Sequence, residues 1–209
     1  MPKKVDHQER REEIARALWR VVEHQGLAGA TMREVSREAN ASLGQVQHYF
    51  SSRTEMLAFA MEYAAEQTAQ RVSLAVGEVA HPRDVVRVTL VEMLPLHPDS
   101  RAASRMSAAY MVEALHDPEL QERLRAGLRD GRDVLEHLLR QAIADGHLPP
   151  SRDPAVEANL LVALTGFTPL LELGVLEPAA ALAAIDEHLD RMFVQSECCP
   201  VRPFPAGNR

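Results

Sequence analysis

The stretch from Thr31 to Arg53, TMREVSREANASLGQVQHYFSSR, constrains the fold more than any other part of the chain. It contains three capping boxes, in which a hydroxyl caps a helix and a Glu or Gln three residues later bonds back to the cap. The three pairs are Thr31 with Glu34, Ser42 with Gln45 and Ser52 with Glu55. They predict three successive helix starts. Two short helices joined by a tight turn form the shape that places one helix in a DNA groove.

Apolar residues recur at three- and four-residue steps along most of the chain, which is the spacing of a buried helix face. They predict helices over about 7–25, 31–39, 42–48, 52–79, 82–94, 99–115, 118–146, 153–174 and 178–194. No alternating strand pattern, internal repeat or low-complexity segment is present. The sequence therefore predicts an all-α protein of about nine helices.

Three backbone positions are expected to shape these helices. Gly26 should end the first helix, because glycine takes a positive φ freely. Asn40 should take the left-handed conformation in the turn between the two short helices. Pro169 should bend the helix over 153–174.

The helix that begins at Ser52 is long enough to lead from the N-terminal module into a larger bundle. We expect a helix-turn-helix DNA-binding domain at 1–52 and a helical ligand-binding and dimerisation domain at 53–196. The tail at 197–209 contains three prolines and should be irregular.

Taken alone, the net charge of −7 argues against DNA binding, but its distribution along the chain does not. Residues 1–56 carry nine Lys and Arg against eight Asp and Glu, whereas residues 57–209 carry fourteen against twenty-two. The acidity therefore lies almost wholly outside the candidate DNA module, which is permissive for phosphate binding at the N-terminal end.

Several classes of protein are not expected. No run of eighteen apolar residues and no apolar signal region are present, so a cytoplasmic location is the default. Cys198 and Cys199 by themselves form neither a disulfide framework nor a zinc site. The nine histidines form no His-x-x-x-His pair, and no nucleophile motif or glycine-rich phosphate loop occurs. We expect no metal, no cofactor and no enzymatic activity.

The N-terminal stretch resembles the DNA-binding domain of the tetracycline-repressor (TetR) family over about residues 10–57. The motif is Gly44-x-x-x-x-Tyr49-Phe50-x-x-Arg53, preceded by Thr31 and Arg33. The chain departs from the family pattern at the Val35-Ser36 pair, the Asn40-Ala41 turn, Gln47 in place of a tyrosine and Arg53 in place of a lysine. More weakly, Ala108–Leu120 is similar to the choline-responsive BetI-like branch. The resemblance implies a dimeric helical repressor that releases DNA when a small molecule binds the C-terminal domain.

Polar residues on the second short helix are candidates for reading bases. Gln pairs with adenine in the major groove and Ser with either kind of base, and the helix offers Ser42, Gln45, Gln47 and His48. Each alone would be typical of a solvated face, but the caps, the helix lengths, the turn and the terminal Tyr49-Phe50 pair together favour contact with DNA. No Lys or Arg lies between Arg37 and Arg53, so this helix brings no guanine-directed arginine.

Most of the affinity for DNA is expected to come from phosphate contacts. Thr31 leaves free amides at a helix start, which suit a phosphate, and Arg33 either reaches phosphates or pairs with a neighbouring glutamate. The resemblance implies phosphate contacts by Tyr49 and Arg53. Gly44 should allow close approach to the DNA backbone or to the preceding helix.

An effector site is harder to read from the sequence. Methionine and aromatic side chains gather on the helices that line pockets in the resembled family, and methionine suits irregular cavities. The candidates are Phe59, Tyr63, Met93, Met106, Tyr110, Met111 and Phe167, with Glu113 as a possible counter-charge for a cationic ligand. Residues at such spacing are also typical of plain core, and Glu113 could be simply exposed.

The last two helices, over about 153–174 and 178–195, are apolar on nearly all sides. A helix of that kind must be covered all round, and no later helix is available. We therefore expect a homodimer with a four-helix interface, the alternative being a monomer with a buried hairpin. A two-fold dimer implies a pseudo-palindromic operator.

Together these features predict a repressor that binds double-stranded DNA as a dimer and is released by a small-molecule effector. The alternative is a DNA-binding regulator or architectural protein without an effector.

Overall fold

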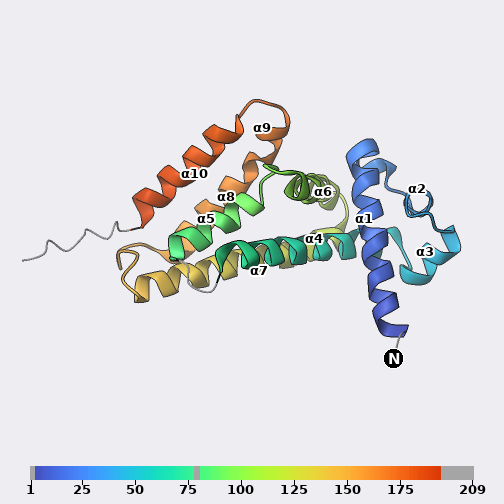
Figure 1. Ribbon diagram of the computed structural model, residues 1–209, viewed down its shortest axis with the longest axis horizontal. Helices are drawn as coiled ribbons and strands as arrows, with labels where there is room; N and C mark the ends of the chain where they lie inside the picture. Colours follow the sequence, from blue (N-terminus) through green and yellow to red (C-terminus); the bar gives the residue numbers. More distant parts are fainter. Residues whose placement is uncertain (1–2, 78–80, 194–209) are drawn as a thin grey trace, which may run out of the picture.

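The computed structural model describes residues 3–77 and 81–193 (Figure 1). These residues form helices, turns and bends and contain no strand, which confirms the all-α prediction. The helices are α1 (Lys3–Gly29), α2 (Met32–Glu38), α3 (Leu43–Tyr49), α4 (Arg53–Val76), α5 (Pro82–Glu92), α6 (Pro98–Ala114), α7 (Pro118–Ala144), α8 (Pro154–Leu164), the 3-10 helix η1 (Thr165–Phe167), α9 (Thr168–Glu172) and α10 (Pro178–Met192).

Figure 1 shows α1, α2 and α3 gathered at one end of the molecule, with α4 and α7 running away from them side by side. The helices α5, α8 and α10 lie at the other end, and α6 lies between the two groups. The long helix α4 thus leads from the N-terminal module into the bundle, as the sequence predicts.

Two of the three expected backbone positions are confirmed, Gly26 and Asn40. Gly26 has φ 69° and ψ 175° and interrupts α1, so that only one short turn of α1 follows it. Asn40 has φ 49° in the turn between α2 and α3. Local chemistry sets both positions, because few residues other than Gly and Asn take the left-handed region easily.

The helix expected over 153–174 is instead three pieces, α8, η1 and α9. Pro169 lacks an N–H and its ring crowds the carbonyl of Thr165, so the α-helical hydrogen bond between these residues cannot form. The chain tightens into the 3-10 turn just before the proline. Pro169 therefore breaks the helix more completely than the expected bend.

Other helix boundaries also differ from expectation. The first helix, expected from about residue 7, begins at Lys3. The helix expected to start at Asp99 begins at Pro98 and is capped by His97, whose Nδ1 accepts from the Ser100 N–H at 3.3 Å. Proline suits the first position of a helix, where its missing N–H costs nothing. The helix expected to reach Val79 ends at Val76, and Gly77 follows with φ 68°. Val79, Cys198, Cys199 and the tail at 197–209 lie outside the described residues.

Two hydrophobic cores hold the helices together. The first joins α1, α2, α3 and α4 to α6 and to the start of α7, through residues such as Leu18, Phe50, Leu57, Met106 and Tyr110. The second joins α5, α7, α8 and α10. The first core crosses the expected domain boundary at residues 52 and 53. The DNA-binding module therefore packs directly against α6 and does not hang from α4 alone.

The last helices have a buried inner face and an apolar outer face. Ala158, Leu161, Ile185 and Leu189 are buried in the second core. On the outer face Leu160 is 47% exposed and Leu173 is 76% exposed, and Val156, Leu170 and several alanines of α10 are exposed beside them. By length and composition alone, Pro154–Glu172 is also the one described segment apolar enough to cross a membrane. Its break at η1 and its packed inner face fit a globular helix pair.

Candidate DNA-binding surface

Hydroxyl caps fix the starts of α2, α3 and α4. The Oγ1 of Thr31 accepts from the Glu34 N–H at 3.2 Å, and the Oγ of Ser52 accepts from the Glu55 N–H at 3.0 Å. Ser42 forms a complete capping box with Gln45, with bonds of 3.1 and 2.9 Å. All three helix starts follow the prediction, because a cap depends only on residues close in sequence.

Only the Ser42 box closes from both sides. The Glu34 carboxylate pairs with Arg37 instead of the Thr31 N–H, at 2.5 Å. The Glu55 carboxylate accepts from the N–H and the hydroxyl of Ser51, at 2.8 and 2.7 Å. These Ser51 bonds hold the pKa of Glu55 below its ordinary value of 4.5.

The short helix α3 presents a polar face to solvent. Ser42, Gly44, Gln45, Gln47 and His48 are exposed. Val46 and Phe50 are buried in the first core, where they hold the angle of α3 against α1 and α2. A Cβ at Gly44 would meet only the Ser42 Oγ, at 4.0 Å, so α2 does not crowd this position. The space in front of Gly44 is open on the solvent side.

The two glutamines of α3 are not equivalent. The Oε1 of Gln45 already accepts from the Ser42 N–H, so only its amide N–H groups remain to bond elsewhere. The Gln47 side chain is exposed and has no hydrogen bond within the described residues. Bidentate pairing with adenine uses both the oxygen and the nitrogen of the amide. Gln47 is therefore the better placed of the two for such a pair.

The arginines of α2 divide between ion pairs and solvent. Arg37 pairs with Glu34, and Glu38 pairs with Arg20 of α1 at 2.6 Å. The Arg20 hydrogen bond lowers the pKa of the exposed Glu38 from its ordinary value. Arg33 is exposed, and its guanidinium has no ion-pair partner in the part of the chain that the structure describes. It is free to reach an anion.

Tyr49 ends α3 beside two imidazoles. Its ring centroid lies 4.7 Å from that of His7 of α1 and 5.2 Å from that of His48. The side chain is half-buried. The first turns of α1 thus border the exposed face of α3.

Arg53 has a different environment from the one the resemblance implies. Its guanidinium and Nε donate to the main-chain carbonyls of Leu27 and Ala30, at 2.8 and 3.0 Å, and it pairs with Glu113 of α6 at 2.9 Å. Arg53 therefore ties the end of α1 and the start of α4 to α6. A DNA phosphate would have to compete with these three partners.

Four of the eight candidate effector residues share the first core, namely Phe59, Tyr63, Met106 and Tyr110, and the other four lie elsewhere. Phe59 and Tyr63 of α4 face α1: the Arg11 guanidinium lies 4.2 Å from the Phe59 ring centroid, and the Tyr63 ring stacks on Trp19 at 5.3 Å. Arg16 also donates to the Tyr63 hydroxyl at 2.6 Å.

The remaining candidates lie in three settings. Met106 and Tyr110 are buried in the first core, and burial raises the pKa of the Tyr110 hydroxyl. Met93 and Met111 are exposed, whereas Phe167 packs against the second core. The Glu113 carboxylate is paired with Arg53.

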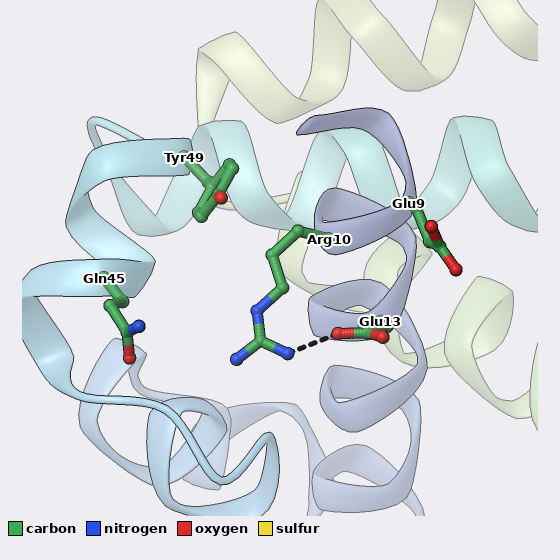
Figure 2. A pocket seen from close by; sticks show the side chains of 5 residues that line it. All are labelled: Glu9, Arg10, Glu13, Gln45 and Tyr49. Atoms are coloured by element: carbon green, nitrogen blue, oxygen red, sulfur yellow. Dashed lines mark hydrogen bonds and ion pairs between the residues drawn. The ribbon is translucent and has the colours of Figure 1, made fainter. Parts of the chain in front are cut away.

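Sequence reasoning missed the part of α1 that lies across from α3. Glu9, Arg10 and Glu13 of α1 and Gln45 and Tyr49 of α3 line a hollow of about 380 Å³ (Figure 2). The recurring charges of α1 were a signal that its outer face is polar. They could not show that α3 lies opposite.

Comparison with known proteins agrees with this architecture. Residues 14–59 match the family model described as bacterial regulatory proteins, tetR family, and residues 82–194 match that of the BetI-type transcriptional repressor C-terminal region. The HTH-type transcriptional regulator PksA of Bacillus subtilis (strain 168) is 34% identical over 166 residues, which are 78% of this chain and 78% of that protein.

Solved structures share the whole fold. A transcriptional regulator from Rhodococcus sp. Rha1 has a TM-score of 0.70 and 30% identity, over 87% of this chain and 95% of its own. A transcriptional regulator from Saccharomonospora viridis in complex with choline has a TM-score of 0.73, over 90% of this chain and 100% of its own, and its 17% identity shows the fold alone. With its capped helix-turn-helix and its helical C-terminal bundle, the chain belongs to the TetR family of DNA-binding transcriptional regulators, which are not enzymes.

Proposed function

We propose that this regulator is a dimeric repressor that leaves its operator when a small molecule binds the C-terminal domain. The observation that carries the proposal is the first hydrophobic core, which joins the helix-turn-helix to α6. Because α1 packs on α6, a displacement of α6 cannot leave the N-terminal module unchanged. Coupling of this kind requires a ligand that prefers one of two arrangements.

The surface of α3 is the proposed reader of bases, through Ser42, Gln45, Gln47 and His48. Gln47 is the first choice for adenine, because its amide is exposed and free of the cap that engages Gln45. Thr31, Arg33 and Tyr49 are the proposed phosphate contacts at the edges of this surface, and Gly44 would allow the DNA backbone to come close. Arg53 remains a proposed phosphate contact only if it gives up its protein partners.

The dimer interface is proposed on the outer faces of α8, α9 and α10. Leu160, Leu170 and Leu173 would otherwise leave large apolar side chains exposed to water, and a cluster of such side chains is typical of an interface. Small alanines on the outer face of α10 would let a second copy approach closely. A symmetric pair of these helices gives two copies of α3 and hence a pseudo-palindromic operator.

The effector is proposed to act by entering the region around α6. Met106 and Tyr110 are packed in the core, so a ligand that reaches them must displace core contacts and move α6. Phe59 and Tyr63 of α4 share that core, whereas the other candidates, Met93, Met111, Glu113 and Phe167, lie outside it and are proposed only as outer contacts. Support for an effector comes from the BetI-type match over 82–194 and the choline-bound relative of the same fold. A cytoplasmic location is proposed, because the chain belongs to a family of bacterial regulators that act on chromosomal DNA.

The test is to select operators from genomic fragments with the purified protein and to measure binding by fluorescence anisotropy. We expect two half-sites separated by about one helical turn of DNA, and light scattering that shows a dimer. Choline is the first effector probe, followed by a panel of other small cations and neutral metabolites. Binding of single half-sites by a monomer would overturn the dimer. If no compound of this panel releases the protein from its operator, the alternative function, a regulator without an effector, replaces the proposal.

A further inference from the structure

The helix α3, which is proposed to contact the bases, carries no Lys or Arg, since none lies between Arg37 and Arg53. The guanidinium that lines the hollow opposite α3 belongs to Arg10 of α1. Arg10 extends from α1 into the space between α1 and α3, with Gln45 and Tyr49 on the opposite side (Figure 2). Gln45 and Tyr49 are four residues apart and therefore share one face of α3.

The position of the first turns of α1 brings Arg10 to the edge of the polar face of α3. His7, three residues before Arg10, packs against Tyr49 with ring centroids 4.7 Å apart. The α1 segment that carries Arg10 therefore runs beside the end of α3 that Tyr49 occupies. An anion held by the Tyr49 hydroxyl would lie in front of the same hollow.

The partner that Arg10 has in the absence of DNA is weak and replaceable. Arg10 pairs with Glu13 one turn later on the same helix, and their side chains are 28% and 44% exposed. An ion pair at this spacing and exposure contributes little to stability. A phosphate offers the guanidinium a bidentate, charge-assisted pair, which is the stronger interaction.

We propose that Arg10 is a DNA phosphate contact that extends the α3 surface onto α1, and that Glu13 competes with the phosphate for its guanidinium. The inference rests on the proposed DNA-facing surface of α3. We assign a phosphate rather than a base edge as the target, because Arg10 lines the same hollow as Tyr49, the proposed contact to the DNA backbone. The cation that α3 lacks is supplied by α1.

Three variants test the proposal by fluorescence anisotropy with the selected operator at several salt concentrations. Arg10→Ala should weaken binding about tenfold, equally for all operator variants, and reduce the salt slope by about 0.9, as expected for one lost phosphate contact. Glu13→Gln should tighten binding severalfold. In Arg10→Ala/Glu13→Gln that gain should disappear, because Glu13 acts through Arg10.

The ion pair of Arg125 and Glu122 on α7 is the matched control. It has the same three-residue spacing and is also exposed, but neither residue lines the hollow between α1 and α3. Arg125→Ala and Glu122→Gln should leave the affinity and the salt slope unchanged. Thermal melting followed by circular dichroism checks that every variant folds.

Three results would overturn the inference. Unchanged affinity and slope in Arg10→Ala would leave Arg10 as a surface ion pair, and a loss confined to particular base pairs would make it a base contact. A Glu13→Gln gain that persists without Arg10 would mean general charge repulsion. If the wild-type protein selects no DNA at all, the proposed function fails, whereas normal binding with a silent Arg10→Ala rejects this inference alone.

Discussion

Replacing Arg53 with alanine tests whether this side chain contacts DNA or holds the protein together. The substitution removes two hydrogen bonds to main-chain carbonyls and one ion pair to Glu113. Hydrogen bonds made by charged groups contribute more than neutral ones, but the Arg53 and Glu113 side chains are 32% and 38% exposed, so water weakens them. We take about 1 kcal/mol for each carbonyl and about 0.5 kcal/mol for the ion pair.

The expected loss of stability is therefore about 2–3 kcal/mol, or about 5–10 °C in melting temperature for a chain of this size. Glu113→Gln removes only the ionic part and should cost about 0.5 kcal/mol. DNA affinity of Arg53→Ala should fall while the slope of log K against log salt stays the same. The reason is that the connection between α1 and α2 loosens but no phosphate contact is lost.

Urea denaturation, thermal melting and anisotropy titrations at several salt concentrations measure these effects. Arg33→Ala is the matched control, because Arg33 is an exposed arginine of the same module without an ion-pair partner among the described residues. It should reduce the salt slope by about 1 without lowering the melting temperature. The reasoning would be refuted if Arg53→Ala behaved like Arg33→Ala. In that case Arg53 contacts phosphate, as the family resemblance implies.

Three further predictions concern the polar face of α3, the dimer interface and the stability of the protein in acid. Gln47→Ala should change the preference for one base pair in each half-site by about 1–3 kcal/mol, measured by competition with operator variants, whereas Tyr49→Phe should weaken all variants equally. Leu160→Arg should convert the dimer to a monomer in light scattering while helical content is unchanged; a persisting dimer would place the interface elsewhere. The hydrogen bond from Arg87 lowers the pKa of Asp186 below its ordinary value of 3.8, so this stabilisation is present above that pH and disappears as the pH falls through the folded pKa. Asp186→Asn should therefore be less stable than the wild type at about pH 7, and the difference should shrink as the pH falls below 3.8. Equal stability at about pH 7 would mean that the pair contributes nothing.

The helix starts could be predicted because caps and turns depend on residues a few positions apart. Ser42 finds Gln45, and Asn40 takes a positive φ, whatever the rest of the chain does. The limit of this reasoning appears at Glu55. Its expected partner was the Ser52 N–H, but the adjacent Ser51 offers both an N–H and a hydroxyl. A spacing rule cannot decide between two competing partners of this kind.

The partners of residues far apart in sequence could not be predicted. Arg53 and Glu113 are sixty positions apart, and each was assigned to an external ligand, phosphate for one and a cation for the other. Periodicity shows that Tyr63 lies on an apolar face but not what covers that face. In the fold Trp19 covers it. A candidate list based on residue type thus mixes side chains that contact ligands with side chains that join two helices.

The contacts that join α6 to the N-terminal module suggest how large a response to an effector can be. Besides the shared core, two ion pairs connect them: Arg53 with Glu113 at 2.9 Å, and Arg105 with Glu23 at 3.4 Å. Both are partly exposed, and pairs of that kind are worth about 0.2–1 kcal/mol each. Breaking both, with some loss of packing, falls in the range of about 1–3 kcal/mol that couples sites in allosteric proteins. Under the proposed mechanism, ion pairs as weak as these are within reach of the binding energy of a small ligand, provided that the ligand prefers one of two arrangements of α6.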